Sequence, residues 1–400
     1  MKIGDHFHLT YCSNIHRGET WTEVSQALAA SLPRLRAQLA FEGPMAVGLR
    51  LSAQAAETLE QPEALAAFRE FLRSGNYYVL TMNGFPYGAF HGQRVKEQVY
   101  EPDWRERARL EYTNRLARLL SVLLSDRPDI EGSVSTSPGA FRANITSEAD
   151  VDAMAAGFLA HAAALVSIRE RTGVTIALAI EPEPACYIET VAEAATFFTT
   201  RLFDPARVAR AARDAGVSMT VDDVRRHMGV CFDACHAAVE FEDPAAAFAL
   251  LREAGVRIGK VQVSSALRMA RQDGAAMRAA FGPFADDTYL HQVVERCADR
   301  LVKYTDLPDA LAGADAAGSA GACEWRVHFH VPVFLGAMKD FDTTQPYLTS
   351  VLDLLKRERA CPYLEVETYT WDVLPPEYRT VDVTTAIARE LMWTKAQIEA

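Results

Sequence analysis

The chain has 400 residues, of which 49% are hydrophobic and 24% are charged, and its formal net charge is −12 at pH 7. This composition is typical of a globular protein, and single α/β barrels commonly exceed about 250 residues. The negative charge argues against a nucleic-acid partner, because binding to phosphates needs clustered Lys and Arg side chains.

No stretch of the sequence approaches the roughly 18 consecutive apolar residues of a membrane span, and residues 1–6 lack the apolar segment of a signal peptide. We therefore expect a cytoplasmic protein with no membrane span. The cysteines are odd in number, are scattered, and include no CxxC pair of the kind found in structural zinc sites. We expect reduced thiols at all seven positions, which are Cys12, Cys186, Cys231, Cys235, Cys297, Cys323 and Cys361.

Short apolar or β-branched runs alternate with longer stretches of helical period, which is typical of repeated βα units around a parallel sheet. The predicted strands cover residues 3–12, 45–52, 77–83, 132–136, 175–181, 229–233, 258–264 and 362–367. The predicted helices cover residues 21–40, 62–73, 104–124, 148–171, 190–198, 244–254, 345–356 and 383–398. Eight strands and eight helices predict a single (β/α)₈ TIM barrel domain spanning residues 1–400.

Two connections are longer than a minimal barrel needs. Residues 183–228 have room for an additional helix, and residues 265–341 form an insertion after the seventh strand. Within the insertion we expect a helix at 287–301, a mobile loop in the small-residue run 310–322, and a strand at 325–334.

Carboxylates stand at the predicted ends of three strands, where a TIM barrel carries its functional residues. Glu181 ends the fifth strand, Asp233 ends the sixth, and Glu365 and Glu367 end the eighth. Side chains alternate along a strand, so small neighbours such as Ala179 place Glu181 inside the barrel. A lone strand-end Glu is usually solvated or paired with a helix cation. Three together would repel one another unless a cation compensates, which favours a divalent metal ion bound by Glu181, Asp233 and Glu367.

The segment 179–184 (AIEPEP) resembles the fifth-strand signature of xylose isomerases, and residues 233–236 (DACH) resemble the acid-x-x-His element of the xylose isomerase-like superfamily. Residues 367–370 (ETYT) are similar to the eighth-strand end of ketose epimerases. The resemblance implies a xylose isomerase-like barrel in which Glu181 and Asp233 bind the metal ion and His236 lies beside the site.

Three longer segments resemble the metabolite traffic protein EboE family, a branch of the same superfamily. They are residues 9–16 (LTYCSNIH), 325–332 (WRVHFHVP) and 365–375 (EVETYTWDVLP). This resemblance implies a role in moving or processing a metabolite, with partner proteins from the same pathway.

The sequence departs from the superfamily at the end of the seventh strand, where epimerases usually have a ligand His. This chain has Gln262 there, whose amide oxygen favours Mg²⁺ or Mn²⁺ over Zn²⁺. An alternative is that His328 or His330 of the insertion supplies the missing imidazole.

Further polar and aromatic residues follow the predicted strands, and they suit a polyhydroxylated ligand that needs a stacking face and hydrogen-bond donors. Arg326, His328 and His330 lie on one face of the predicted strand 325–334. That face is expected to cover the barrel mouth as a lid, with protonated histidines and a ligand affinity that varies around neutral pH. The candidate substrate-binding residues are Asn14, His16, Asn83, Tyr87, His91, Arg326, His328 and His330.

Two functions fit these residues. The first is a metal-dependent isomerase or epimerase of a sugar, cyclitol or related compound, in which Glu181, Glu367 and His236 are catalytic and move a proton between the two faces of the substrate. The second is a non-catalytic protein that carries a pathway intermediate to its partners. A phosphodiesterase is disfavoured, because it needs more His ligands and a basic groove.

Overall fold

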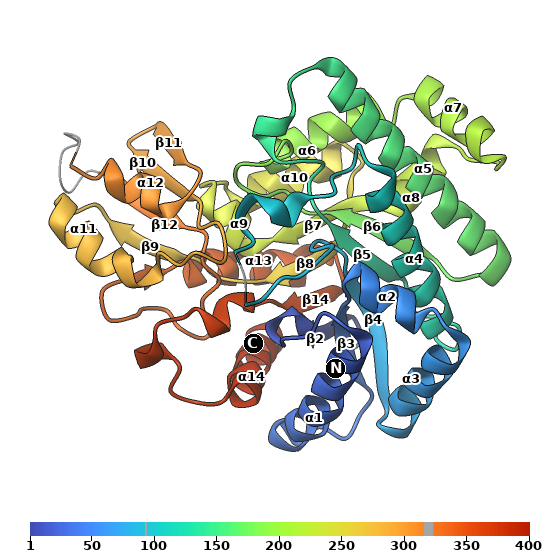
Figure 1. Ribbon diagram of the computed structural model, residues 1–400, viewed down its shortest axis with the longest axis horizontal. Coiled ribbons are helices and arrows are strands. Elements are labelled where there is room, and N and C mark those ends of the chain that lie inside the picture. The colour runs from blue at the N-terminus through green and yellow to red at the C-terminus, as the bar shows by residue number, and fades with distance from the viewer. Residues whose placement is uncertain (93, 316–322) are drawn as a thin grey trace.

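The computed structural model describes residues 1–92, 94–315 and 323–400. Its main sheet has nine strands in the order β1-β2-β14-β8-β7-β6-β5-β4-β3, and a bridge between Cys12 and Gly48 brings β2 against β3. Eight parallel strands thus close into a barrel (Figure 1). They are β2 (Phe7–Tyr11), β3 (Met45–Arg50), β4 (Tyr77–Asn83), β5 (Gly132–Thr136), β6 (Ile176–Ile180), β7 (Met228–Asp233), β8 (Arg257–Val263) and β14 (Tyr363–Val366).

Each of these strands lies within a predicted strand or one residue beyond it, so the TIM barrel prediction is confirmed. The first predicted strand, residues 3–12, is divided. Its start forms β1 (Lys2–Ile3), which pairs antiparallel with β2. The chain reverses between them at Gly4, whose φ of +57° suits a residue without a side chain.

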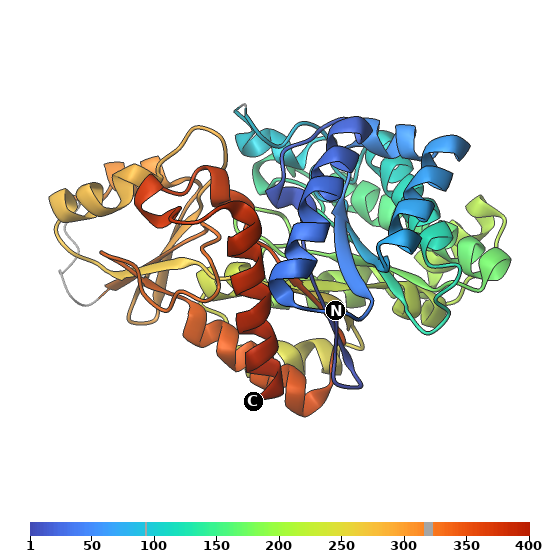
Figure 2. The ribbon, with the colours of Figure 1, turned by 90° about the horizontal axis from the view of Figure 1, so that it is seen from below.

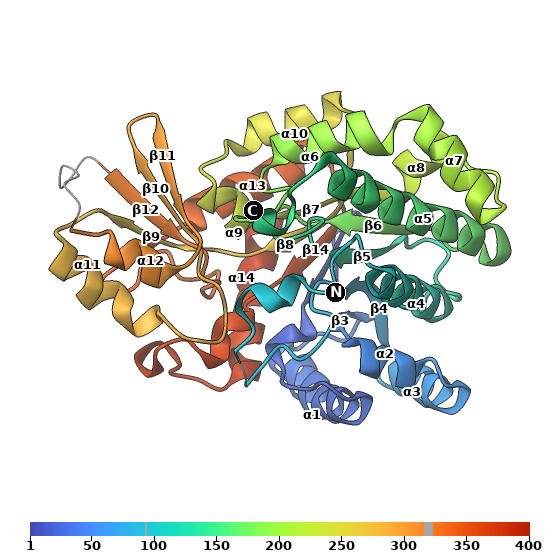
Figure 3. The same cartoon turned by 45° about the horizontal axis from the view of Figure 1, so that its top comes forward.

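Helices surround the barrel on its outside, as Figure 3 shows for α1 to α8 and α10. Several begin with a capping box, in which the N-cap hydroxyl and an acidic residue three positions later satisfy free backbone N–H groups; Thr20 with Glu23 starts α1 in this way. The main helices are α1 (Trp21–Leu39), α2 (Ala53–Leu59), α3 (Pro62–Ser74), α4 (Arg107–Leu123), α5 (Glu148–Thr172), α6 (Val191–Phe197), α7 (Pro205–Ala215), α8 (Val221–His227), α9 (Ala234–Val239), α10 (Pro244–Glu253), α13 (Gln345–Glu358) and α14 (Val383–Glu399).

Helix α5 is the one described helix that is long and apolar enough to cross a membrane by length and composition. In the structure, 61% of its most apolar 18-residue window is buried. Its apolar character is therefore accounted for by packing in the helical layer around the barrel.

The insertion after β8 forms a second sheet, which lies to one side of the barrel in Figures 1 and 2. The sheet has the order β11-β10-β12-β9-β13, and every pairing in it is antiparallel. Its elements are β9 (Leu267–Ala270), α11 (Gly274–Phe281), β10 (Val293–Cys297), β11 (Arg300–Tyr304), α12 (Leu307–Ala312), β12 (Cys323–Val327) and β13 (Asp342–Thr343).

Of three expectations for the insertion, one was wrong, one lies mostly outside the described residues, and one was right only in its first part. The predicted helix 287–301 is instead a loop followed by β10 and the start of β11, because β10 pairs on both sides with β11 and β12. The predicted loop 310–322 begins inside α12, while residues 316–322 lie outside the described residues. The predicted strand 325–334 ends at Val327, after which the backbone leaves the sheet.

The prediction that all cysteines are reduced thiols was also wrong. Cys297 and Cys323 lie opposite each other in the β10–β12 pair, with their Cα atoms 4.3 Å apart, and form a disulfide. Because they are 26 positions apart in sequence, only the strand pairing makes them neighbours. The other five cysteines are buried and free.

The barrel interior contains a buried ion pair between Lys260 on β8 and Glu365 on β14, with each side chain only 1% exposed. The Lys260 ammonium also donates to the Ser135 hydroxyl, 3.1 Å away. Glu365 points at Gly48, where a Cβ atom would collide with the carboxylate and with the Tyr11 carbonyl. Gly48 therefore lets β3 close the barrel around this ion pair.

We predict that Lys260→Met lowers the free energy of unfolding by roughly 3–5 kcal/mol, because the substitution leaves the Glu365 carboxylate buried without its counter-charge. Denaturant unfolding followed by circular dichroism measures the change. Arg257→Met is the control, since its ion pair with Glu131 is partly exposed and should be worth about 1 kcal/mol or less. Equal stabilities of Lys260→Met and the parent protein would contradict this role.

Candidate functional site

Three carboxylates meet at the C-terminal end of the barrel. Asp233 is the last residue of β7, Glu181 directly follows β6, and Glu367 directly follows β14. One ligand atom from each lies within 4.8 Å of the other two, and the residues are 2 to 4% exposed. The structure thus brings together the three carboxylates that the sequence predicted as metal ligands.

Hydrogen bonds hold two of these carboxylates and leave specific oxygens free. Glu367 Oε1 accepts from the side-chain amides of Asn14, at 2.7 Å, and Asn83, at 2.9 Å. Asp233 Oδ1 accepts from the Ser264 hydroxyl at 2.7 Å and from a backbone N–H at the start of α9. Among the described residues, Glu181 Oε2 and Asp233 Oδ2 have no hydrogen-bond partner. These unpaired oxygens are available to a ligand.

The electrostatics of the three carboxylates reflect their burial. Burial, with repulsion from Glu367 and Asp233, raises the pKa of Glu181 well above its usual value. Burial and repulsion from Asp233 raise the pKa of Glu367 to about 8. Burial also acts to raise the pKa of Asp233, but the histidines His236 and His330 and its hydrogen bonds outweigh it and lower that pKa. A cation among them would remove the repulsion, and oxygen donors suit a hard divalent ion.

Gln262 provides a further buried oxygen near this group. It lies on β8 between β7 and β14, opposite Asp233 on one side and Glu365 on the other. The residue is 0% exposed, and neither polar atom of its side chain has a hydrogen-bond partner among the residues that the structure describes. An unsatisfied buried amide is costly, so its oxygen is available to a ligand.

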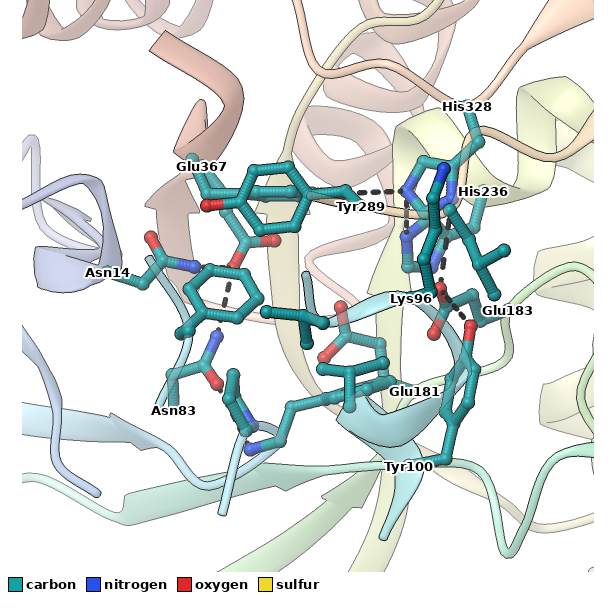
Figure 4. Close-up of a pocket in the computed structure, with 17 residues that line it drawn as sticks. Asn14, Asn83, Lys96, Tyr100, Glu181, Glu183, His236, Tyr289, His328 and Glu367 are labelled. Atoms are coloured by element: carbon teal, nitrogen blue, oxygen red, sulfur yellow. Dashed lines mark hydrogen bonds and ion pairs between the residues drawn. The ribbon is translucent and has the colours of Figure 1, made fainter. Parts of the chain in front are cut away.

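Above the carboxylates lies a cavity, shown in Figure 4, whose wall combines amides, tyrosines, acids and imidazoles. Glu183 lies on one side, where its carboxylate accepts a hydrogen bond of 2.9 Å from the Tyr100 hydroxyl. The lining residues are Asn14, Asn83, Phe85, Pro86, Phe90, Val95, Lys96, Val99, Tyr100, Glu181, Glu183, His236, Tyr289, Leu290, His328, Glu367 and Tyr369. This mixture suits a small polar ligand with several hydroxyl groups.

Most of the predicted site residues lie in or next to this cavity. Asn14, Asn83, Glu181, His236, His328 and Glu367 line it. Asp233, Gln262 and His330 are buried but do not line it. His91 supports the wall from outside, because its ring nitrogens contact the Asn14 carbonyl at 2.6 Å and the Tyr289 hydroxyl at 2.7 Å.

Besides His91 and His330, three more of the predicted substrate-binding residues do not line the cavity. His16 hydrogen-bonds the Tyr11 hydroxyl, and Tyr87 packs edge-on against Tyr112. Arg326 pairs with Glu324 and donates to the Ala238 carbonyl. Because β12 ends at Val327, Arg326 and the two histidines beyond it do not share one strand face as expected.

The expectation that His328 and His330 are protonated near neutral pH was also wrong. Burial lowers the pKa of His328 well below its usual value, and the neighbouring histidines lower it further. Burial lowers the pKa of His330 to about 4, although Asp233 acts in the opposite direction. Desolvation of the rings thus outweighs the attraction of the carboxylates.

Sequence reasoning missed several lining residues, notably Lys96, Tyr100, Glu183, Tyr289 and Tyr369. Glu183 and Tyr369 belong to segments singled out by their resemblance to known families, so a signal for them existed. Lys96 and Tyr100 come from the 3₁₀ helix η2 (Lys96–Tyr100) after β4, and Tyr289 comes from a loop of the insertion. No strand end marks these three, and only the folded chain places them at the barrel mouth.

No protein-family model and no curated protein match this sequence. Among solved structures, the chain is similar to a xylose isomerase-like TIM barrel protein from Mycobacterium smegmatis in complex with magnesium, with 11% identity, a TM-score of 0.52 and coverage of 100% of this chain and 98% of that one. It is also similar to the probable 3-DHS dehydratase AsbF from Bacillus anthracis, with 11% identity, a TM-score of 0.46 and coverage of 96% of this chain and 97% of that one. A third similar structure is the IOLI protein with a binding zinc atom, with 13% identity, a TM-score of 0.45 and coverage of 98% of this chain and 97% of that one. At such low identity the comparisons concern the fold alone, and they leave the EboE resemblance as a prediction. The chain therefore has the fold of a xylose isomerase-like TIM barrel.

Proposed function

We propose that this chain is a metal-dependent isomerase or epimerase of the EboE type that acts on a polyhydroxylated small metabolite. The observation that carries this proposal is the convergence of Glu181, Asp233 and Glu367, with unpaired oxygens, beneath a cavity lined by amides and tyrosines. The segments 325–332 and 365–375, which resemble EboE, contribute His328, Glu367 and Tyr369 to the cavity wall.

Glu181, Asp233 and Glu367 would hold a Mg²⁺ or Mn²⁺ ion, with the Gln262 amide as the fourth donor. The bound ion would stabilise negative charge on a substrate oxygen. His328 and His330 are the alternative candidates for the fourth position, because Gln292 and the Glu367 carbonyl engage only their Nδ1 atoms and leave each Nε2 able to bind.

The protein groups then orient the substrate and move its proton. The Asn14 and Asn83 amides fix Glu367 on one side of the cavity, and Glu181 enters it from β6 (Figure 4). Two carboxylates at one carbon atom can remove a proton from one side and return it to the other, which gives isomerisation or epimerisation. Tyr289 and Tyr369 offer aromatic faces to the ring of the substrate.

The first prediction concerns the metal ion. Glu181→Gln and Glu367→Gln should each weaken Mn²⁺ binding by at least about tenfold, because loss of even an outer-shell partner typically costs about 10- to 100-fold. Gln262→Leu should weaken it less, since no charge is lost. Isothermal titration calorimetry on metal-free protein measures the affinities. Glu131→Gln, at the opposite end of the barrel, is the control. Unchanged Mn²⁺ affinity in both Glu181→Gln and Glu367→Gln would refute this metal site.

The second prediction concerns the reaction. In D₂O, the Mn²⁺-loaded protein should interconvert a ketose, aldose or keto-cyclitol pair and place deuterium on the carbon next to the carbonyl, as NMR will detect. Glu181→Gln should lower kcat/KM by about 10²- to 10⁴-fold, the usual contribution of a general base, and Glu131→Gln should not. Tight binding of such a compound without turnover or exchange would instead favour the carrier function.

A further inference from the structure

Three histidine rings converge beside the carboxylates. His236 lies in α9, and His328 and His330 follow β12. The Nε2 atom of His328 lies 3.1 Å from that of His236 and 3.2 Å from that of His330. All three residues are at most 5% exposed, and Figure 4 shows the rings of His236 and His328 directed at each other.

The partners of the other ring nitrogens decide where the protons are. His236 Nδ1 lies 2.9 Å from the Pro182 carbonyl, and His330 Nδ1 lies 2.8 Å from the Glu367 carbonyl. A carbonyl oxygen only accepts hydrogen bonds, so each Nδ1 carries the proton. In the neutral rings, the converging Nε2 atoms therefore present lone pairs.

The same holds for His328. Its Nδ1 lies 2.6 Å from Gln292 Oε1. The orientation of that amide is determined by its nitrogen, which donates to the Pro184 carbonyl at 3.0 Å, so the oxygen must accept from His328. The Nε2 lone pair of His328 thus faces those of His236 and His330.

A cation among the three nitrogen atoms removes this repulsion, and the geometry fits one. Ligand atoms bound at about 2.0–2.1 Å in a tetrahedron are about 3.3 Å apart. The Nε2 atom of His328 lies at nearly this distance from those of His236, at 3.1 Å, and His330, at 3.2 Å. Asp233 Oδ2 lies 3.9 Å from His236 Nε2 and 4.0 Å from His330 Nε2, and it has no hydrogen-bond partner among the described residues. It is available as a fourth ligand.

We propose that His236, His328 and His330, with Asp233, bind a second metal ion, and that this ion is Zn²⁺ or a similar borderline-soft cation. Three imidazoles suit zinc, whereas the all-oxygen site of Glu181, Asp233 and Glu367 suits Mg²⁺ or Mn²⁺. Asp233 would then link the two ions. The inference goes beyond the proposed reaction and assigns His236 to metal binding rather than to proton transfer.

The hydrogen bonds from each Nδ1 have the arrangement expected of zinc-bound histidines, whose second nitrogen usually donates to a carbonyl or carboxylate that orients the ring. Because His236 and His328 also line the cavity, an ion held by them is placed to contact the substrate.

The test measures metal content in metal-free protein that is reloaded with Zn²⁺ and Mn²⁺ together and then desalted. Elemental analysis should find about one zinc and one manganese per chain. His236→Gln and His328→Gln should each lower the Zn²⁺ affinity at least about tenfold and leave Mn²⁺ bound. Asp233 is not a useful probe, because both sites share it.

His227→Gln is the matched control. His227 is also buried and donates from Nδ1 to a carbonyl, that of Ile176 at 2.7 Å, but it lies outside the cluster. Zinc binding that is unaffected by His236→Gln and His328→Gln would overturn the proposal. Glu181→Gln separates the two sites: it should release Mn²⁺ and retain Zn²⁺. Retention of both ions would reject the carboxylate site while leaving the histidine site intact.

Discussion

The structure depends on charge compensation inside the barrel. Glu181, Asp233, Glu365 and Glu367 are at most 4% exposed, and the Lys260 ammonium pairs with one of them, Glu365. One positive charge does not balance four negative charges in a medium of low dielectric constant, so protons or bound cations must supply the difference. The raised pKa values of Glu181 and Glu367 show the same imbalance in the absence of ions.

The insertion places the imidazoles of His328 and His330 beside these buried carboxylates. Strand β12 ends at Val327, and a backbone hydrogen bond of 2.8 Å from His328 to the Gln292 carbonyl holds the chain that follows. A second, from Val331 to the Ser265 carbonyl at 2.9 Å, anchors the segment against the end of β8. The disulfide between β10 and β12 braces the sheet from which this segment leaves.

The unpaired polar atoms of the site have a cost. Each buried polar group that lacks a partner typically costs about 1–3 kcal/mol, and atoms of Glu181, Glu183, Asp233 and Gln262 are in this position among the described residues. These four residues lie together toward the C-terminal end of the barrel. Such clustering is expected of a site prepared for a ligand, because the bound ligand satisfies the groups that the fold leaves unpaired.

The sequence by itself determined the barrel fold and the position of the acidic site at the C-terminal ends of the strands. Strand period and spacing predicted all eight barrel strands, and the ends of three strands predicted the meeting of Glu181, Asp233 and Glu367, because parallel strands align their carboxyl ends. Only the tertiary structure decided the disulfide, the strands of the insertion, and the positions of Tyr289 and the converging histidines. Those contacts join segments far apart in sequence through antiparallel pairing and loop paths, which leave no periodic signal in the chain.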